Sequence, residues 1–180
     1  MNDTYLGNPN VKRDGIVTQF DITEVDEYRK CMGDPSYFAS KYCKIIHLDR
    51  GLVNFELYDY QSKMFDHFTD ERFCIVLACR QSGKSISSVA YLLWFAIFHP
   101  EKVVAILANK GATSQEMLGR VILMLENLPF FLQPGCKSLN KKSIEFSNNS
   151  RIVAAATSGS SIRGMSVNLL YLYISSYFIW

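Results

Sequence analysis

The chain has 180 residues, of which 48% are hydrophobic, 20% charged and 13% aromatic. This composition supplies enough apolar surface for the core of one domain, and it excludes a disordered, collagen-like or coiled-coil chain. The formal net charge of +2 hides an uneven distribution, because residues 1–71 carry 13 acidic and 8 basic side chains and residues 72–180 carry 4 acidic and 11 basic ones. The last acidic side chain is Glu145, so the final 35 residues contain none.

The cysteines and the apolar stretches indicate the compartment. The five cysteines form no Cys-x-x-Cys pair, and the polar N-terminus lacks the apolar segment of a signal peptide. We therefore expect a reducing compartment and no disulfide framework. The apolar stretches 86–98 and 167–180 are shorter than the roughly 20 residues that span a bilayer, so no membrane segment is expected.

The N-terminal part is predicted to be mainly helical. Residues 1–20 are interpreted as a loose polar lead-in, and a capping-box pattern at residues 23–26 predicts a helix to about Met32. Asp34-Pro35, an N-cap followed by proline, predicts a second helix to about Cys43. Two short strands and an amphipathic helix are then expected at residues 44–47, 52–57 and 58–68.

From residue 72 the predicted elements alternate between strand and helix. The continuous apolar run 73–79 predicts a strand buried on both faces of a parallel sheet, and residues 85–98 predict a buried crossover helix. Further elements are expected at 103–108, 113–127, 143–146 and 151–155 and, after a Ser/Gly-rich loop at 158–166, at 169–172. This order predicts an α/β fold, with a mostly parallel sheet, flanking helices and a small helical N-terminal subdomain.

Residues 78–85, Ala-Cys-Arg-Gln-Ser-Gly-Lys-Ser, lie between the predicted strand and the buried helix, where a phosphate-binding P-loop belongs. Such a loop wraps phosphates with backbone N–H groups, while a lysine contacts the β- and γ-phosphates and a serine hydroxyl contacts Mg²⁺. The usual first glycine is Ala78 here, and the alternative is a Ser/Gly turn before an ordinary helix. The flanking elements favour nucleotide binding by Gln81, Ser82, Gly83, Lys84 and Ser85, with Ser85 as the metal contact.

Three further features have a functional and a structural interpretation. Tyr60 and Gln61, about twenty residues upstream, could stack on adenine and pair with it, or could be helix surface and core. Cys79 is either a buried inert thiol or one made reactive at a helix N-terminus. Basic residues could contact DNA or form a solvated hairpin face, and they are Lys137, Lys141, Lys142 and Arg151.

Five segments resemble the large terminase subunit, the ATP-driven DNA-packaging motor of tailed phages. They are CMGDPSYF (31–38), LDRGLVNFELYDYQSKMF (48–65), ACRQSGKS (78–85), ILANKGATSQEMLGRV (106–121) and SGSSIRGMSVNLLYL (158–172). The arginine inside the loop is the most specific feature. The resemblance implies a P-loop NTPase fold and an ATPase that uses ATP and Mg²⁺ to translocate double-stranded DNA into a procapsid. It also implies the portal protein and the small terminase subunit as partners, a homo-oligomer for a complete protein, and the host cytoplasm, transiently at the procapsid portal.

The resemblance implies roles for individual residues. Arg80 would sense or stabilise the γ-phosphate, and Arg80 and Lys84 are the predicted catalytic residues. Tyr60 and Gln61 match the family's adenine-binding motif. Arg163 either faces the nucleotide or a neighbouring subunit, or is a solvated loop arginine.

The chain departs from the family pattern after Leu172. Family members continue there with an Asp-Glu pair that organises Mg²⁺ and polarises the attacking water, whereas this chain reads Tyr173-Ile174-Ser175. We therefore expect weak ATP binding with negligible hydrolysis. We divide the chain into an N-terminal adenine-side subdomain (1–71), a partial P-loop ATPase core (72–172) and an aberrant apolar tail (173–180). This division treats the chain as truncated at Walker B by a frameshift or intron read-through and without the nuclease domain.

Two other functions are compatible with these motifs. A helicase-like, nucleic-acid-stimulated ATPase shares the glutamine motif and the P-loop, although the Arg-Gln pair inside the loop argues against it. A non-catalytic nucleotide-binding fragment would bind ATP without turnover unless a second chain supplied the acids.

Overall fold

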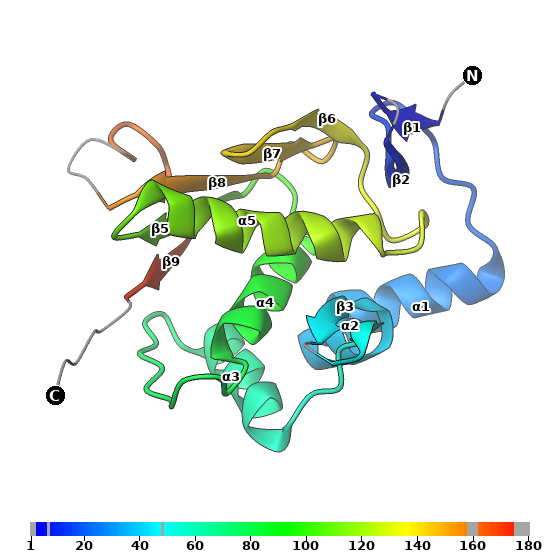
Figure 1. The fold of residues 1–180 in the computed structure, drawn as a ribbon. Coiled ribbons are helices and arrows are strands. Elements are labelled where there is room, and N and C mark those ends of the chain that lie inside the picture. The colour runs from blue at the N-terminus through cyan, green and yellow to red at the C-terminus, as the bar shows by residue number, and fades with distance from the viewer. Residues whose placement is uncertain (1–2, 7, 48, 158–161, 175–180) are drawn as a thin grey trace, which may run out of the picture.

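The computed structural model describes residues 3–6, 8–47, 49–157 and 162–174 (Figure 1). Within these ranges the helices are α1 (Ile22–Gly33), α2 (Pro35–Tyr42), α3 (Asp59–Asp70), α4 (Lys84–Phe98) and α5 (Gly111–Glu126). The strands are β1 (Thr4–Tyr5), β2 (Asn8–Lys12), β3 (Lys44–His47), β4 (Gly51–Asn54), β5 (Val103–Ala108), β6 (Cys136–Leu139), β7 (Ser143–Phe146), β8 (Arg151–Ala156) and β9 (Leu169–Tyr173).

The central sheet has five strands in the order β6-β7-β8-β5-β9. Strand β5 pairs in parallel with β8 and β9, whereas β6, β7 and β8 pair antiparallel. The predicted α/β class is confirmed, but the sheet is mixed rather than mostly parallel. The difference arises because Asn149, with φ of 62°, turns the chain back directly after β7, and because β6, which was not predicted, adds an antiparallel edge.

Helices α4 and α5 cover the sheet, and the N-terminal helices cover α4 (Figure 1). Helix α5 lies over β5 and β8, and the apolar α4 packs between α5 and α3. The predicted buried helix is confirmed, but it is not a crossover between parallel strands, because no strand of the described sheet precedes it in the chain. The Trp94 indole of α4 donates to the Cys31 carbonyl of α1 at 2.7 Å, and Phe38 of α2 packs edge-on against Phe98 of α4. Residues 1–71 and 72–172 therefore contribute to one continuous hydrophobic cluster.

The N-terminal predictions hold in outline but not in detail. The α2 cap is confirmed, since Asp34 accepts from the N–H groups of Ser36 and Tyr37. Helix α1 begins earlier than predicted, because the capping box is formed by Asp21 and Glu24. The predicted lead-in contains β1 and β2, which depend on a tertiary contact: the Lys12 N–H donates to the Gln133 side chain at 2.9 Å.

The predicted strand at residues 73–79 is wrong. This apolar segment has no strand pairing and is solvent-exposed, with exposed fractions of 83% for Phe73, 90% for Ile75 and 93% for Leu77. An apolar run becomes a strand only when a neighbouring strand satisfies its backbone groups. Strand β9 was expected in the core but forms an edge of the described sheet, with Leu170 and Leu172 exposed. Among the described helices, none is both long and apolar enough to cross a bilayer.

Candidate functional site

The loop that leads into α4 is a tight left-handed turn. Gln81 has φ of 61° and Gly83 has φ of 79°, and the Gly83 carbonyl accepts the N–H groups of Ile86 and Ser87. Gly83 is the N-cap of α4, so the free N–H groups and the positive end of the helix dipole lie at this loop. The local geometry therefore suits an anion.

The lysine and serine of the loop fold back onto the loop itself. Lys84 Nζ and Ser82 Oγ each donate to the Cys79 carbonyl at 2.9 Å. A neutral carbonyl is a weaker partner for an ammonium group than a phosphate oxygen is. Lys84 can therefore exchange this bond for a bound phosphate. Cys79 is exposed, so the buried alternative for its thiol is wrong.

Gln61 is buried against the loop rather than exposed in the pocket. Its exposed fraction is 1%, and its Oε1 accepts the Tyr58 N–H at 2.9 Å. A Cβ atom on Gly83 would lie 2.6 Å from Gln61 Nε2, so glycine is required at position 83 by space as well as by φ. Gln61 thus holds the start of α3 against the loop.

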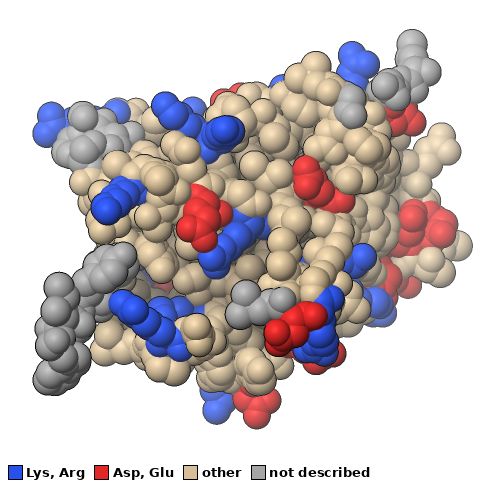
Figure 2. Space-filling model, viewed as in Figure 1, with Lys and Arg blue, Asp and Glu red and all other residues tan. Residues whose placement is uncertain are grey.

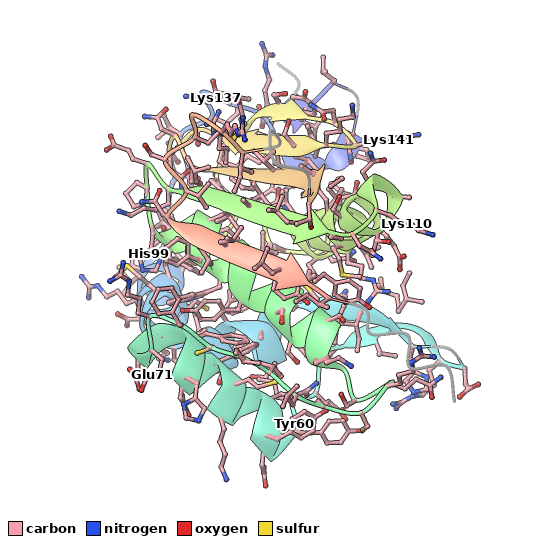
Figure 3. All side chains as sticks on the ribbon, turned by 90° about the vertical axis from the view of Figure 1, so that its left-hand side faces the viewer. Tyr60, Glu71, His99, Lys110, Lys137 and Lys141 are labelled. Carbon is pink, nitrogen blue, oxygen red and sulfur yellow. The ribbon has the colours of Figure 1, made fainter. Side chains whose placement is uncertain are left out.

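Tyr60 lies at the same end of α3, beside the loop (Figure 3). Its hydroxyl donates to the Ser82 carbonyl, and its ring stacks on Tyr58 with centroids 5.8 Å apart. Partial burial raises the pKa of the Tyr60 hydroxyl, which favours its protonated, donating form. Both rings are partly exposed, so they offer an aromatic surface next to the loop.

A pocket of about 840 Å³ opens beside the loop. Its walls come from the loop and the start of α4, from β3, from α5 and from the end of β9. The lining residues are Ala78, Arg80, Gln81, Gly83, Lys84, Ser85, Ile86, Ile45, Ile46, Arg120, Leu123, Tyr173 and Ile174. Of the predicted site residues, the pocket therefore gathers Arg80, Gln81, Gly83, Lys84 and Ser85, whereas Tyr60, Gln61 and Ser82 support the loop from outside it.

The end of β9 lies at the same pocket as the loop at residues 78–85. Tyr173 and Ile174, at the positions where the resemblance predicts the Asp-Glu pair, line the same pocket as Lys84. Tyr171 lies two residues earlier in β9, and burial raises the pKa of its hydroxyl. The end of β9 therefore contributes one aromatic and one aliphatic side chain to the pocket.

These residues do not fit a magnesium site held by the protein. Mg²⁺ prefers octahedral oxygen ligands and is usually held by one or two carboxylates together with substrate phosphates. The described lining of the pocket includes the Ser85 hydroxyl but no carboxylate, and Glu116 is paired with Arg120 at 2.7 Å. The described part of the chain brings together no group of three or more His, Cys, Asp or Glu side chains that could hold a metal.

The basic hairpin and Arg163 lie apart from the pocket. Lys137 and Lys141 are at the β6–β7 end of the molecule, opposite Tyr60 (Figure 3), and Lys137 donates to Asn149 at 2.7 Å. Arg163 is exposed on the turn before β9. Figure 2 shows that basic side chains predominate on the left of this face and acidic ones on the right, near α1, which reflects the uneven charge of the sequence.

Another pocket, of about 490 Å³, lies between the N-terminal segment and residues 131–135. It contains Lys12, whose ammonium group donates to the carbonyls of Phe130 and Gln133, both at 3.3 Å. Burial lowers the pKa of Lys12. Lys12 therefore links β2 to the backbone of residues 130–133, and this structural role explains why a lysine is buried here.

Sequence reasoning missed the pocket walls contributed by other elements. The residues that were not predicted to be site residues are Arg120, Leu123, Ile45 and Ile46. Arg120 lies in the segment 106–121 that carries the family resemblance, and its i,i+4 spacing from Glu116 was visible. The packing that turns this face of α5 toward the loop could not be derived from spacing.

Comparison with known families adds one finding. Residues 75–172 match the family described as "Terminase large subunit, T4likevirus-type, N-terminal". The match covers more than half of the chain. The matched residues include the loop at 78–85, helices α4 and α5, and the strands of the central sheet as far as Leu172 in β9. Arg120 also lies within the match.

Proposed function

Because the chain belongs to the T4-like family of terminase large subunits, whose role is phage DNA packaging, we propose that its loop at residues 78–85 binds the phosphates of ATP. The observation that carries this proposal is the convergence of three features at one pocket. A left-handed glycine caps α4, Lys84 makes an exchangeable bond to a carbonyl, and Arg80 lines the same wall.

The proposed binding mode follows from the chemistry of these groups. The N–H groups at the start of α4 would hold phosphate oxygens, and Lys84 would leave the Cys79 carbonyl for the β- and γ-phosphates. Arg80 would contact the γ-phosphate, as the resemblance implies. Tyr60 and Tyr58 would give the adenine an aromatic surface, while Gln61 would act mainly by fixing the loop.

We propose that this chain binds ATP with negligible turnover. A glutamate general base typically contributes 10²–10⁴-fold to such a reaction. At the two positions where the resemblance implies acids, this chain has Tyr173 and Ile174, and neither side chain is a carboxylate base. Glu116 does not line the pocket, and its carboxylate is paired with Arg120 at 2.7 Å. This observation favours the non-catalytic nucleotide-binding fragment as the second candidate function.

The wider role is proposed from the family alone. It comprises ATP hydrolysis by a complete terminase, coupled to translocation of double-stranded DNA in the host cytoplasm and at the procapsid portal. The portal protein and the small terminase subunit are the proposed partners. A helicase-like ATPase would instead unwind DNA without a portal, and the family match favours packaging.

Calorimetric titration of the chain with ATP tests the binding proposal. We expect saturable binding by the unmodified chain, strong weakening in Lys84→Ala, and no change in the control Lys141→Ala, whose side chain lies at the far end of the molecule (Figure 3). Equal affinities of the unmodified chain and the Lys84→Ala variant would refute the proposed site.

A further inference from the structure

Arg120 is a cation of the pocket that comes from outside the phosphate loop. It lies on α5, one turn before Leu123, and both residues line the pocket that Arg80 and Lys84 also line. The loop alone therefore does not determine the charge of the site. Three cationic side chains, from two separate parts of the chain, border the same space.

The surroundings of Arg120 place its charge near the start of α4. Helix α5 packs against α4, and Arg120 lines the same pocket as Lys84 and Ser85 in the first turn of α4. Arg120 is thus close to the helix end that is proposed to hold phosphate, in addition to lining the pocket wall.

The present partner of Arg120 is easily replaced. Arg120 Nη2 lies 2.7 Å from Glu116 Oε1, an i,i+4 pair on the helix surface whose two side chains are both substantially exposed. Exposed pairs of this kind contribute little to stability. A guanidinium group, in contrast, binds phosphate oxygens through two parallel hydrogen bonds and is well suited to phosphate recognition.

We propose that Arg120 is a phosphate-binding residue, an inference that rests on the proposed nucleotide site. When a nucleotide binds, Arg120 would leave Glu116 and pair with the terminal phosphate. Glu116 competes with that phosphate when the site is empty. The site would therefore discriminate nucleoside triphosphates from diphosphates through a side chain of α5, and binding of a triphosphate would join α5 to the phosphate loop.

Binding of ATP and of ADP to matched variants of the whole chain tests this proposal. Arg120→Ala should weaken ATP binding by about tenfold, equivalent to about 1.4 kcal/mol, and should weaken ADP binding much less. Glu116→Gln should change ATP affinity in the opposite direction, because it removes the competitor and keeps the arginine. A folding defect would not strengthen binding, so this variant separates recognition from stability.

The matched controls are Arg29→Ala and Asp26→Asn, which dissect another exposed helical pair, with 3.8 Å between Arg29 Nη1 and Asp26 Oδ1 on α1. Both should bind ATP and ADP as the unmodified chain does. An unchanged ratio of ATP to ADP affinity in Arg120→Ala would overturn the role of Arg120. If this occurs while Lys84→Ala still abolishes binding, only the Arg120 proposal fails; if the unmodified chain binds no ATP, the proposed function fails with it.

Discussion

The amide of Gln61 packs so closely against Gly83 that a Cβ atom at position 83 would lie 2.6 Å from Gln61 Nε2. This contact joins the first turn of α3 to the N-cap of α4. The sequence indicates two separate motifs, the Tyr-Gln pair and the loop at residues 78–85, and the structure packs them against each other. A ligand that orders the loop would also order the start of α3.

We predict that Gly83→Ala destabilises the chain by about 1–3 kcal/mol, because alanine is strained at φ of 79° and its methyl group collides with Gln61. Urea denaturation measures the change. The double variant Gly83→Ala/Gln61→Ala should recover the part due to the collision. Gly111→Ala, at a position with open space, is the control and should be neutral or slightly stabilising. A fully stable Gly83→Ala would contradict the described loop.

We predict that ATP slows alkylation of Cys79 several-fold, because its carbonyl is the acceptor that Lys84 and Ser82 now occupy and the nucleotide would cover this part of the loop. Mass spectrometry can follow each thiol separately. Cys74 is an internal control, since it is also exposed and its thiol donates to the His67 carbonyl outside the pocket. Equal protection of both thiols would indicate a general change in structure and not a ligand at the loop.

We predict that Glu27 stabilises the fold at neutral pH and stops doing so in strong acid. Hydrogen bonds from Lys41, at 2.6 Å, and from Tyr42 and Tyr37 lower the pKa of Glu27 to about 2. A carboxyl group whose pKa is lowered on folding contributes stability above its unfolded pKa of about 4.3, and this contribution is lost as the pH falls through the folded pKa.

Thermal melts of Glu27→Gln between about pH 6 and pH 2 test this prediction. The variant should melt below the unmodified chain near pH 6, and the gap should close toward pH 2. Asp26→Asn, whose pairing with Arg29 is looser, should show a smaller gap throughout. A gap that is independent of pH would refute the electrostatic role of Glu27.

We predict that the exposed segment 73–77 drives self-association. Its large apolar side chains, those of Phe73, Ile75 and Leu77, are almost fully exposed, and such patches promote association between chains. Ile75→Lys and Leu77→Lys should reduce light scattering at high protein concentration with little change in the free energy of unfolding. Ile22→Lys, an equally exposed site on α1, should leave association unchanged. A large loss of stability in Ile75→Lys would show that the side chain is buried in solution.

The sequence predicted the elements whose signals are local. The Asp34-Pro35 cap, the apolar α4 and the β5 run each contain their own signal, and the structure has all three. Residues 73–79 have an equally clear apolar pattern but form no strand, because strand formation depends on pairing with another segment. Strand β6 is the opposite case, a strand that was not predicted. Apolar and polar residues do not alternate regularly over Cys136–Leu139, and the strand forms by pairing with β7.

The candidate site follows the same division. The loop residues could be predicted because they are consecutive in the sequence, at residues 78–85. The position of Arg120 in the pocket and the burial of Gln61 result from the packing of α5 and α3 against that turn. The spacing of residues in the sequence does not predict this tertiary packing. The lack of acidic side chains after Glu145 is visible in the sequence, and the structure adds that Tyr173 and Ile174 line the same pocket as Lys84.

Equilibrium dialysis against γ-labelled ATP, followed by chromatography of the nucleotide in the protein chamber, tests the central claim most directly. The account predicts excess label in the protein chamber, recovered as intact ATP, and no excess with Lys84→Ala. No excess label with the unmodified chain, or label recovered as free phosphate in an amount that Lys84→Ala abolishes, would contradict binding without turnover.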